Sequence, residues 1–249
     1  MTSIDKTMDA LRGDAEHGDQ EAARELGRLL CLQPTLDDGD SADDRWPGEL
    51  WLRIALARRP DDTIAATLLA SELVQQITAM LNGEPSFDSD SAEEAVDRRI
   101  AEVRELYAGV LAVDSSDPAA EAGTALLDEV IEGEQPDPST IGYSYYLVEN
   151  DAGHSSTGHL EQLVVTDPDE LRWACGHWFE RYGGLAGFTM ATYVDGEQVR
   201  VTDLGAVTVD PDDLPDWAAV DIPPLPGELL PIGHPVGPCH YGYTTHPVD

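Results

Sequence analysis

The sequence pattern changes across Gly133-Glu-Gln-Pro-Asp-Pro-Ser-Thr140 and the segment Tyr143-Ser-Tyr-Tyr-Leu-Val-Glu149 that follows it. The first segment is polar and carries prolines, which is typical of a connection between structural units. The second is rich in aromatic and β-branched residues and favours a strand. Apolar residues recur at helical spacing before this point, and short strand-like runs follow it. The sequence therefore predicts an α+β protein whose helices come first.

The predicted organisation has four parts along the chain. An all-α, helical-repeat-like domain covers residues 1–134, and a linker covers 135–139. A small mixed α/β sheet domain covers 140–210, and a proline-rich ordered coil or tail covers 211–249. Prolines are concentrated in this last part, which excludes long helices and central strands there. The tail is predicted to wrap over the sheet; the alternative is a flexible peptide that binds a partner.

Capping residues mark the helices of the N-terminal part. Helix starts are predicted at Asp19, Pro47, Asp61 or Asp62, the capping box Ser91-Ala-Glu-Glu94, and Asp117-Pro118. Helix ends are predicted near Pro34, Pro60, Gly83 and Gly133. Between these signals the apolar residues fall on one side of each helix, so a layered helical structure is expected.

One of these helices resembles a known repeat. The segment Gly18-Asp-Gln-Glu-Ala-Ala-Arg-Glu-Leu-Gly-Arg-Leu-Leu30 is similar to the first helix of Sel1-like and tetratricopeptide repeats. Residues 55–62, and 106–114 with the Asp-Pro pair that follows, resemble the end of a second repeat helix and its turn. The resemblance covers about half the chain and implies stacked helical hairpins with a scaffolding, inhibitory or immunity-type role. An irregular helical bundle is the alternative, because the proline signals are unevenly spaced.

The C-terminal part resembles no family, and its elements are predicted from local pattern alone. Strands are expected at 143–149, 160–166, 188–194, 198–203 and 206–209, with a helix over 169–182. Asp195-Gly196 is the strongest hairpin signal, because both residues readily adopt the positive φ of a tight turn. This order predicts a small sheet with one helix packed on one face.

The net charge of −35 restricts the partners that the chain can bind. Its 49 acidic residues outnumber 14 basic ones, and Lys6 is the only lysine. Such a surface repels nucleic acid and anionic lipid, so neither a nucleic-acid nor a membrane partner is expected. Three interpretations stay open: acid-rich usage across a GC-rich or salt-adapted genome, a surface for a basic protein partner, and mimicry of DNA.

The cysteines and the N-terminus predict a cytoplasmic protein. Cys31, Cys175 and Cys239 are far apart, odd in number and form no Cys-x-x-Cys pair, which indicates reduced thiols. Acidic residues interrupt the N-terminal stretch from Asp5 onward, so no apolar leader or membrane span is expected.

No metal or cofactor is predicted. His234, Cys239, His240 and His246 have metal-binding side chains, but their spacing matches no known cluster. The acidic residues 37–44 lack the closing carboxylate of a calcium loop. Ser155 and Ser156 lie beside His154, but the strained nucleophile turn of hydrolases is absent from the sequence. No catalytic residue is therefore predicted.

These observations predict a protein-interaction module, either an adaptor, an inhibitor or an immunity-type protein, whose acidic surface suits a basic partner. The candidate partner-binding residues are Trp46, Trp51 and Tyr107. Whether the chain is an enzyme stays open, although the prediction leans against it. The first alternative is an enzyme or small-ligand sensor with a C-terminal pocket lined by Tyr145, His154, His159, Trp178 and Tyr193. The second is a self-associating structural protein, a homo-oligomer in which 143–149 forms an exposed sheet edge or the sheet pairs across a twofold axis.

Overall fold

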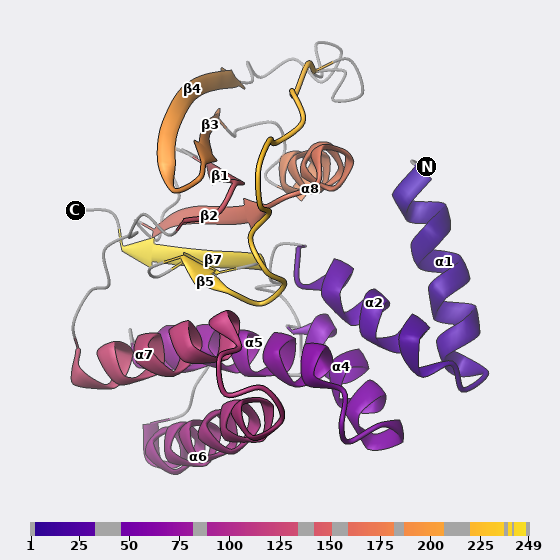
Figure 1. Ribbon diagram of the computed structural model, residues 1–249, viewed down its shortest axis with the longest axis vertical. Coiled ribbons are helices and arrows are strands. Elements are labelled where there is room, and N and C mark those ends of the chain that lie inside the picture. The colour runs from indigo at the N-terminus through magenta and orange to yellow at the C-terminus, as the bar shows by residue number, and fades with distance from the viewer. Residues whose placement is uncertain are drawn as a thin grey trace.

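A computed structural model describes residues 3–32, 46–81, 89–133, 142–150, 159–181, 187–206, 220–236, 239–240 and 242–247. Helices make up the N-terminal half, and an antiparallel sheet with one further helix makes up the C-terminal half (Figure 1). The predicted α+β class is therefore confirmed. Within the described ranges, no helix combines the length and the hydropathy needed to cross a bilayer.

The helices of the N-terminal half begin close to the predicted starts. They are α1 (Ser3–Glu16), α2 (Gln20–Leu30), α4 (Pro47–Arg58), α5 (Thr63–Leu81), α6 (Ser89–Val113) and α7 (Pro118–Glu132). The Asp19 side chain accepts a hydrogen bond from the Ala22 amide at 3.0 Å and caps α2. The Asp117 side chain caps α7 in the same way. The exception is α6, which begins at Ser89, so the predicted capping box at residue 91 lies inside the helix rather than at its start.

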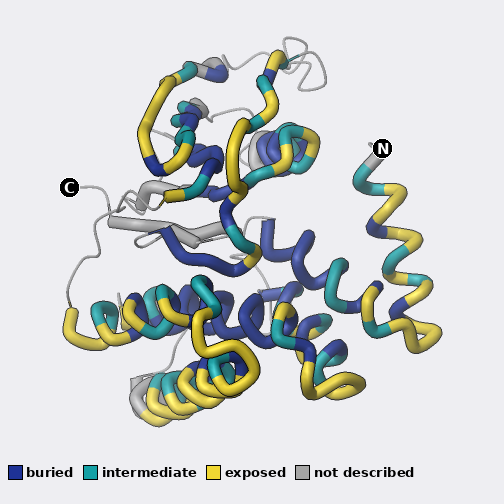
Figure 2. Tube along the Cα trace, viewed as in Figure 1, coloured by how far each residue is buried: buried dark blue, intermediate teal, exposed yellow. Residues whose placement is uncertain are grey.

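The helices pack as neighbours in chain order. α2 contacts α4, α4 contacts α5, and α5 contacts both α6 and α7. In Figure 1, α5 and α7 lie between the sheet and α6, so α6 is on the side of the helical half that faces away from the sheet. Figure 2 shows that α5 is buried, whereas α6 exposes a continuous outer face.

The main sheet has the strand order β4-β3-β1-β2-β7 and is antiparallel throughout. Its strands are β1 (Tyr145–Asn150), β2 (His159–Val165), β3 (Gly187–Val194), β4 (Glu197–Ala206) and β7 (Gly242–Pro247). Helix α8 (Pro168–Arg181) follows β2, and β5 (Pro235–Val236) pairs with β6 (Cys239–His240) as a separate two-stranded ribbon.

Two details of the sheet bear on the predictions. Asp195 and Gly196 have φ values of 50° and 83° and turn β3 into β4, as the hairpin signal indicated. The expectation that 143–149 forms an exposed edge is wrong, because β1 is hydrogen-bonded to β2 on one side and to β3 on the other. The strand expected at 206–209 overlaps the end of β4 at Ala206, and its remaining residues lie outside the described ranges.

One hydrophobic core joins the two halves of the chain. Leu26, Leu29 and Leu30 of α2 pack in the same cluster as Tyr146 and Val148 of β1. The cluster also includes residues from α1, α8 and three more strands: Met8, Leu171, Ala174, Leu163, Val165, Met190 and Leu204. A second core lies within the helical half and a third on the opposite face of the sheet. The α1–α2 end of the helical half is therefore fused to the sheet by apolar packing.

Residues 220–236, named the strap here, run as coil from α8 to the helical layer. At one end the carbonyl of Val220 accepts a hydrogen bond from Arg172 of α8 at 3.0 Å. In the middle, the backbone of Ser144 bonds both to Glu228 at 2.8 Å and to Leu230 at 3.1 Å. At the other end the strap forms β5, which contacts α7 (Figure 1). The C-terminal end of the strap therefore lies between the sheet and helices α5 and α7.

Candidate functional site

The strap meets α5 and α7 through polar groups, and this contact is named the seam. It consists of Thr67, Ser71, Tyr107, Asp117, Gly233 and His234. The second hydrophobic core contains helix residues and no strap residue, while the third contains strap and sheet residues and no helix residue. Among the described residues, the seam therefore separates two apolar cores by a layer of hydrogen-bonding groups.

Ser71 of α5 makes the central hydrogen bond of the seam. Its Oγ donates to the carbonyl of Gly233 at 2.7 Å and lies 3.3 Å from the hydroxyl of Tyr107. Burial raises the pKa of Tyr107 to about 12, so its hydroxyl stays protonated at neutral pH. Helices α5 and α6 and the strap are thus linked by uncharged hydrogen bonds.

Gly233 is at this position because a side chain would not fit. Its φ is +81°, and a Cβ atom built on it would lie 2.7 Å from Cγ2 of Thr67. The His234 amide donates to the Pro231 carbonyl at 3.1 Å, so Gly233 is the third residue of a tight turn, the position at which a positive φ favours glycine. The turn presses the strap backbone directly against α5.

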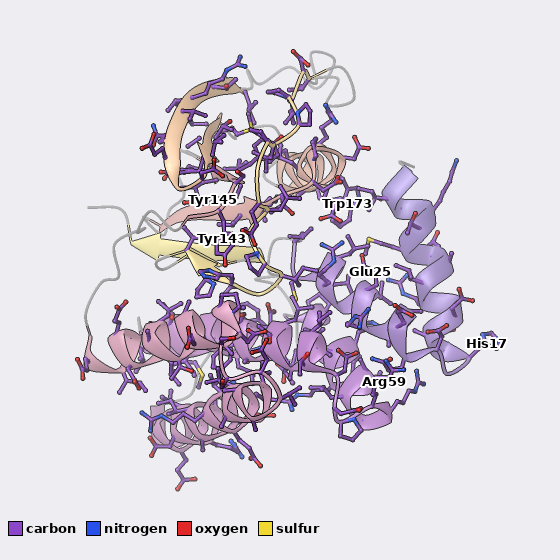
Figure 3. All side chains as sticks on the ribbon, in the orientation of Figure 1. His17, Glu25, Arg59, Tyr143, Tyr145 and Trp173 are labelled. Atoms are coloured by element: carbon purple, nitrogen blue, oxygen red, sulfur yellow. The ribbon has the colours of Figure 1, made fainter. Side chains whose placement is uncertain are left out.

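His234 closes the seam beside α7. Its side chain is buried, Nδ1 lies 2.7 Å from the carbonyl of Pro235, and its ring meets that of Tyr143 edge to face at 5.6 Å. Figure 3 shows Tyr143 where the sheet half meets the helical layer. Burial lowers the pKa of His234, although the Pro235 carbonyl and the Asp117 carboxylate act in the opposite direction. The imidazole is therefore neutral at neutral pH, with Nδ1–H donating to Pro235.

Helix α7 carries the exposed charge next to the seam. Its acidic residues are Glu121, Asp128, Glu129 and Glu132, and no basic residue occurs between 118 and 132. Asp128 pairs with Arg104 of α6 at 3.2 Å, but both side chains are more than half exposed, so this ion pair contributes little. The side of the molecule that contains the seam thus presents an acidic helix.

A second polar group of residues lies inside the helical half. Burial, followed by the neighbouring Glu72, raises the pKa of the Cys31 thiol well above its usual value. Burial also raises the pKa of Glu72 to about 8, with a further contribution from Glu49. Both groups are therefore protonated at neutral pH, so Cys31 is not a thiolate nucleophile.

Glu49 connects this buried pair to the surface. Gln76 donates to Glu49 at 2.6 Å and accepts from Arg99 at 2.8 Å. Arg53 bridges Glu49 and Glu102, and hydrogen bonding to Glu102 raises its pKa above its usual range. Glu49 thus accepts hydrogen bonds from a guanidinium and an amide, while the buried Glu72 is uncharged. These contacts stabilise the packing of α4, α5 and α6.

The candidate partner-binding residues lie in two kinds of environment, the interior and a half-buried position. Tyr107 is 2 % exposed and Trp46 is 8 % exposed, so both belong to the interior. Trp51 is half-buried and packs against two cores. These positions are not adjacent to one another on the surface, and partner binding by them stays a prediction.

The candidate pocket residues are brought together only in part. Tyr145 of β1 and Tyr193 of β3 are neighbours across the sheet, with stacked rings 4.6 Å apart. His159 begins β2 and Trp178 lies in α8, but their side chains, and all of His154, are outside what the structure describes. Elsewhere in α8, Cys175 is buried, and burial raises the pKa of its thiol to about 12. Nε2 of His177 lies 3.4 Å from a carboxylate oxygen of Asp5 in α1.

The residues that the sequence analysis missed all depend on long-range contacts. Ser71 and Glu72 interrupt the apolar face of α5, and this run of polar residues in a long apolar helix was the available signal. Gly233, placed between two prolines, was a turn signal. Nothing in the local sequence links these positions, because Ser71 and Gly233 are 162 residues apart.

Comparison with known proteins gives no match: no protein-family model, no curated protein and no solved structure is similar to this chain. Over the residues with described side chains, no group of three or more His, Cys, Asp or Glu side chains is placed to hold a metal ion. The side chains of Cys239, His240 and His246 lie outside that set, while His234 is engaged in the seam.

Proposed function

We propose that the chain is a protein-interaction module of stacked helical hairpins that binds a basic protein segment beside α7. The order of helix contacts supports the first part, because α2 packs against α4, α4 against α5 and α5 against α6, and contact between consecutive helices is also the rule in tetratricopeptide-like repeats. Within this proposal the module acts as an adaptor, an inhibitor or an immunity-type protein.

The excess acidity of α7, in which Asp128 alone of the four acids has a described ion pair, is the observation that carries the proposal. Exposed carboxylates without basic neighbours on the same helix create a negative potential that attracts a basic segment and raises its association rate. The net charge of −35 extends this field over the molecule. Because salt screens charges separated by more than about 10 Å at 0.1 M, binding of this kind weakens as ionic strength rises.

The proposed site of action is the cytoplasm. Cys31 and Cys175 are both free and buried, and burial raises the pKa of both thiols. Such thiols are inert packing residues rather than disulfide partners, which suits a reducing compartment. No catalytic group and no cofactor are needed for a binding module of this type.

The alternative functions have less support among the described residues. Tyr145 and Tyr193, which would line the pocket of an enzyme or sensor, pack in the third hydrophobic core together with Leu230 and Val236 of the strap. This packing favours a structural role for both rings. Self-association through residues 143–149 lacks the open edge that it needs, because β1 is paired on both sides.

The proposal is tested by affinity capture from native lysate with the full-length chain as bait, washed at 50 mM and 500 mM salt. The test variant replaces three exposed acids of α7: Glu121→Gln, Asp128→Asn and Glu132→Gln. A matched control makes the same charge change on α1: Asp9→Asn, Asp14→Asn and Glu16→Gln. All six residues are exposed.

We expect a basic protein that is retained by the wild type at low salt, released at high salt, retained by the α1 variant and lost from the α7 variant. Loss from both variants would indicate that total charge, rather than α7, decides binding. A partner that is retained equally by the wild type and the α7 variant would refute the proposed site.

A further inference from the structure

We infer that the face of β3 and β4 that is turned toward α8 holds a binding site for a small carboxylate, formed by Thr192, Arg200 and Thr202. The site lies on the opposite face of the sheet from Tyr145 and Tyr193, and it is independent of the binding proposed at α7. Three observations support it: two unpaired hydroxyls, an arginine without a described ion pair, and the shape of β4.

The first observation is that Thr192 of β3 and Thr202 of β4 carry buried hydroxyls that the chain itself does not satisfy. In the described part of the chain, their Oγ1 atoms are the two buried side-chain polar atoms without a hydrogen-bond partner. Thr192 is only 6 % exposed, so bulk water does not hydrate it. A buried hydroxyl without a partner destabilises a fold, so each such group requires a physical explanation. A ligand that accepts both hydrogen bonds supplies one.

The strand register places the two hydroxyls on one face of the sheet, next to Arg200. Thr192 lies opposite Tyr146 of β1 and Arg200 of β4, while Thr202 lies opposite Met190 of β3. Directly opposite residues share a face, and Tyr146 and Met190 both belong to the core that contains α8 residues. The two threonines are therefore diagonal neighbours, at positions about 7–8 Å apart. Their hydroxyls do not bond each other, but one group with two acceptor oxygens can bridge them.

The second observation is that Arg200 supplies a positive charge at the open side of this site. It is exposed on β4, an edge strand of the sheet, and among the described residues it forms no ion pair. By contrast, Arg172 of α8 is occupied by Asp169 and by the Val220 carbonyl. In a chain of net charge −35, an arginine that no carboxylate of the described chain neutralises is suited to bind one from outside.

The third observation is the shape of β4. Its register with β3 shifts twice, so Val199 and Leu204 have no opposite residue. Bulges bend a strand, re-aim its side chains and are common beside binding sites. Figure 1 shows β4 as a strongly curved ribbon at the end of the sheet. The short segment between the two shifts carries both Arg200 and Thr202.

The three groups together favour a carboxylate over other ligands. A guanidinium only donates hydrogen bonds, and the two hydroxyls lack an acceptor, so the ligand must accept. One arginine neutralises one negative charge, which matches a carboxylate. A phosphate group carries close to two charges at neutral pH, so it leaves charge unpaired in a chain whose own field already repels anions.

The test follows the threonine methyl signals of the full-length chain by NMR while sodium acetate is added up to 100 mM, with sodium chloride keeping the ionic strength constant. Sodium phosphate is titrated in the same way as the competing oxyanion. The site variant is Arg200→Gln, which removes the charge from an exposed side chain. The matched control is Arg59→Gln, which makes the same change at an exposed arginine at the end of α4.

We expect acetate to shift the Thr192 and Thr202 methyl signals along one saturating curve, in the wild type and in Arg59→Gln alike. Arg200→Gln should bind acetate at least tenfold more weakly, because the charge that pairs with the carboxylate is gone. Phosphate should bind the wild type at least tenfold more weakly than acetate does. Shifts that do not saturate, or equal acetate binding by the wild type and Arg200→Gln, would overturn the inference. Phosphate binding as tight as that of acetate would overturn the assignment to a carboxylate.

Thr192→Val gives a second readout that does not depend on NMR. Valine keeps the shape of threonine and removes the unpaired hydroxyl, so the thermal unfolding midpoint without ligand should rise by about 2–4 °C. Acetate should then raise the midpoint of the wild type but not that of the variant. Thr124→Val is the matched control, because its hydroxyl donates to the Ala120 carbonyl at 2.8 Å, and it should not gain stability. A lower midpoint for Thr192→Val would mean that its hydroxyl is already satisfied without a ligand, which contradicts the inference.

Discussion

Gly48 has no Cβ atom, and its surroundings leave no room for one. A Cβ atom there would lie 2.4 Å from Sγ of Cys31 and 2.9 Å from the carbonyl of Gly27. Gly27 is equally crowded, since its Cβ would lie 2.8 Å from Leu52. These two glycines let α2 and α4 approach closely enough to bury Cys31 against Glu72. A single atom at residue 48 therefore controls the spacing of a helix pair.

Replacing Gly48 with alanine should lower the free energy of unfolding by about 2 kcal/mol, because the added methyl group overpacks the α2–α4 contact. Gly109→Ala on the exposed face of α6 is the matched control, since nothing lies within 4 Å of its Cβ position. There alanine should raise stability by about 0.5–1 kcal/mol through its better helix propensity. Urea unfolding of both variants measures the effect, and a stabilised Gly48→Ala protein would contradict the packing argument.

The buried carboxyl of Glu72 should make stability depend on pH. Its pKa is about 8 in the folded chain against an ordinary value of 4.5, so the folded state holds a proton that the unfolded state releases over this range. Unfolding free energy therefore falls as pH rises from about 4.5 to 8, and a shift of this size corresponds to a few kcal/mol. Below and above this pH range, Glu72 does not make the free energy of unfolding depend on pH.

Glu72→Gln removes this titration and keeps the shape of the side chain. The stability of the variant relative to wild type should increase steadily from pH 5 to pH 8 and then level off, as measured by urea unfolding at each pH. Glu105→Gln, at an exposed position on α6, controls for loss of a charge. A Glu72→Gln difference that does not change with pH would show that the carboxyl is ionised in the folded protein.

At the scale of elements, α2 is tied to α8 by a buried ion pair as well as by the shared core. Arg28 is buried and donates to Glu25 on its own helix and to Glu170 on α8, the latter through a bond of 2.9 Å. Asp5 of α1 reinforces the joint, because it accepts a hydrogen bond from the indole of Trp173 at 2.9 Å. Charged partners in a poorly solvated contact specify how the two elements are oriented.

Arg28→Ala should lower the free energy of unfolding by roughly 3 kcal/mol, because it removes the guanidinium that pairs with Glu170, whose side chain is only 15 % exposed. Arg104→Ala breaks the ion pair with Asp128 between α6 and α7, where both side chains are more than half exposed, and should cost less than about 1 kcal/mol. Denaturant unfolding of the two variants gives the comparison. Equal effects would mean that burial does not decide the strength of these pairs.

At the scale of the whole molecule, the two halves depend on each other. The core that includes Leu26 and Leu30 of α2 is completed by Tyr146 and Val148 of β1. The predicted boundaries at 134 and 140 therefore lie between parts that share packed surface, whereas independently folding domains have their own cores. The strap adds a second connection on the other side of the sheet.

Fragments 1–134 and 140–249 should consequently fail to fold cooperatively when each is made alone. Each would expose its side of the shared core and bind a hydrophobic dye, and mixing equal amounts should restore a single unfolding transition together with native dye exclusion. Circular dichroism melts and dye fluorescence measure this outcome. A fragment that melts cooperatively by itself, at the temperature of the full chain, would instead support independent domains.

Helix starts, the hairpin and the fold class could be predicted from the sequence because they depend on bonds within a few residues. The Asp19 and Asp117 caps each bond three residues ahead, and Asp195-Gly196 turns the chain on itself. The α6 start was misplaced by the same local reasoning, since a good capping box at residue 91 did not prevent the helix from beginning at Ser89.

Tertiary structure alone decided the strand order, the protonation of Glu72 and the seam. Arg28 and Glu170 are 142 residues apart, and Ser71 and Gly233 are 162 residues apart, so no local pattern could pair them. The physical reason is that burial and opposing charges act through space. These effects arise only after distant segments have packed together. They then determine which carboxyl group stays protonated, which position accepts only glycine and which strand lies at the edge of the sheet.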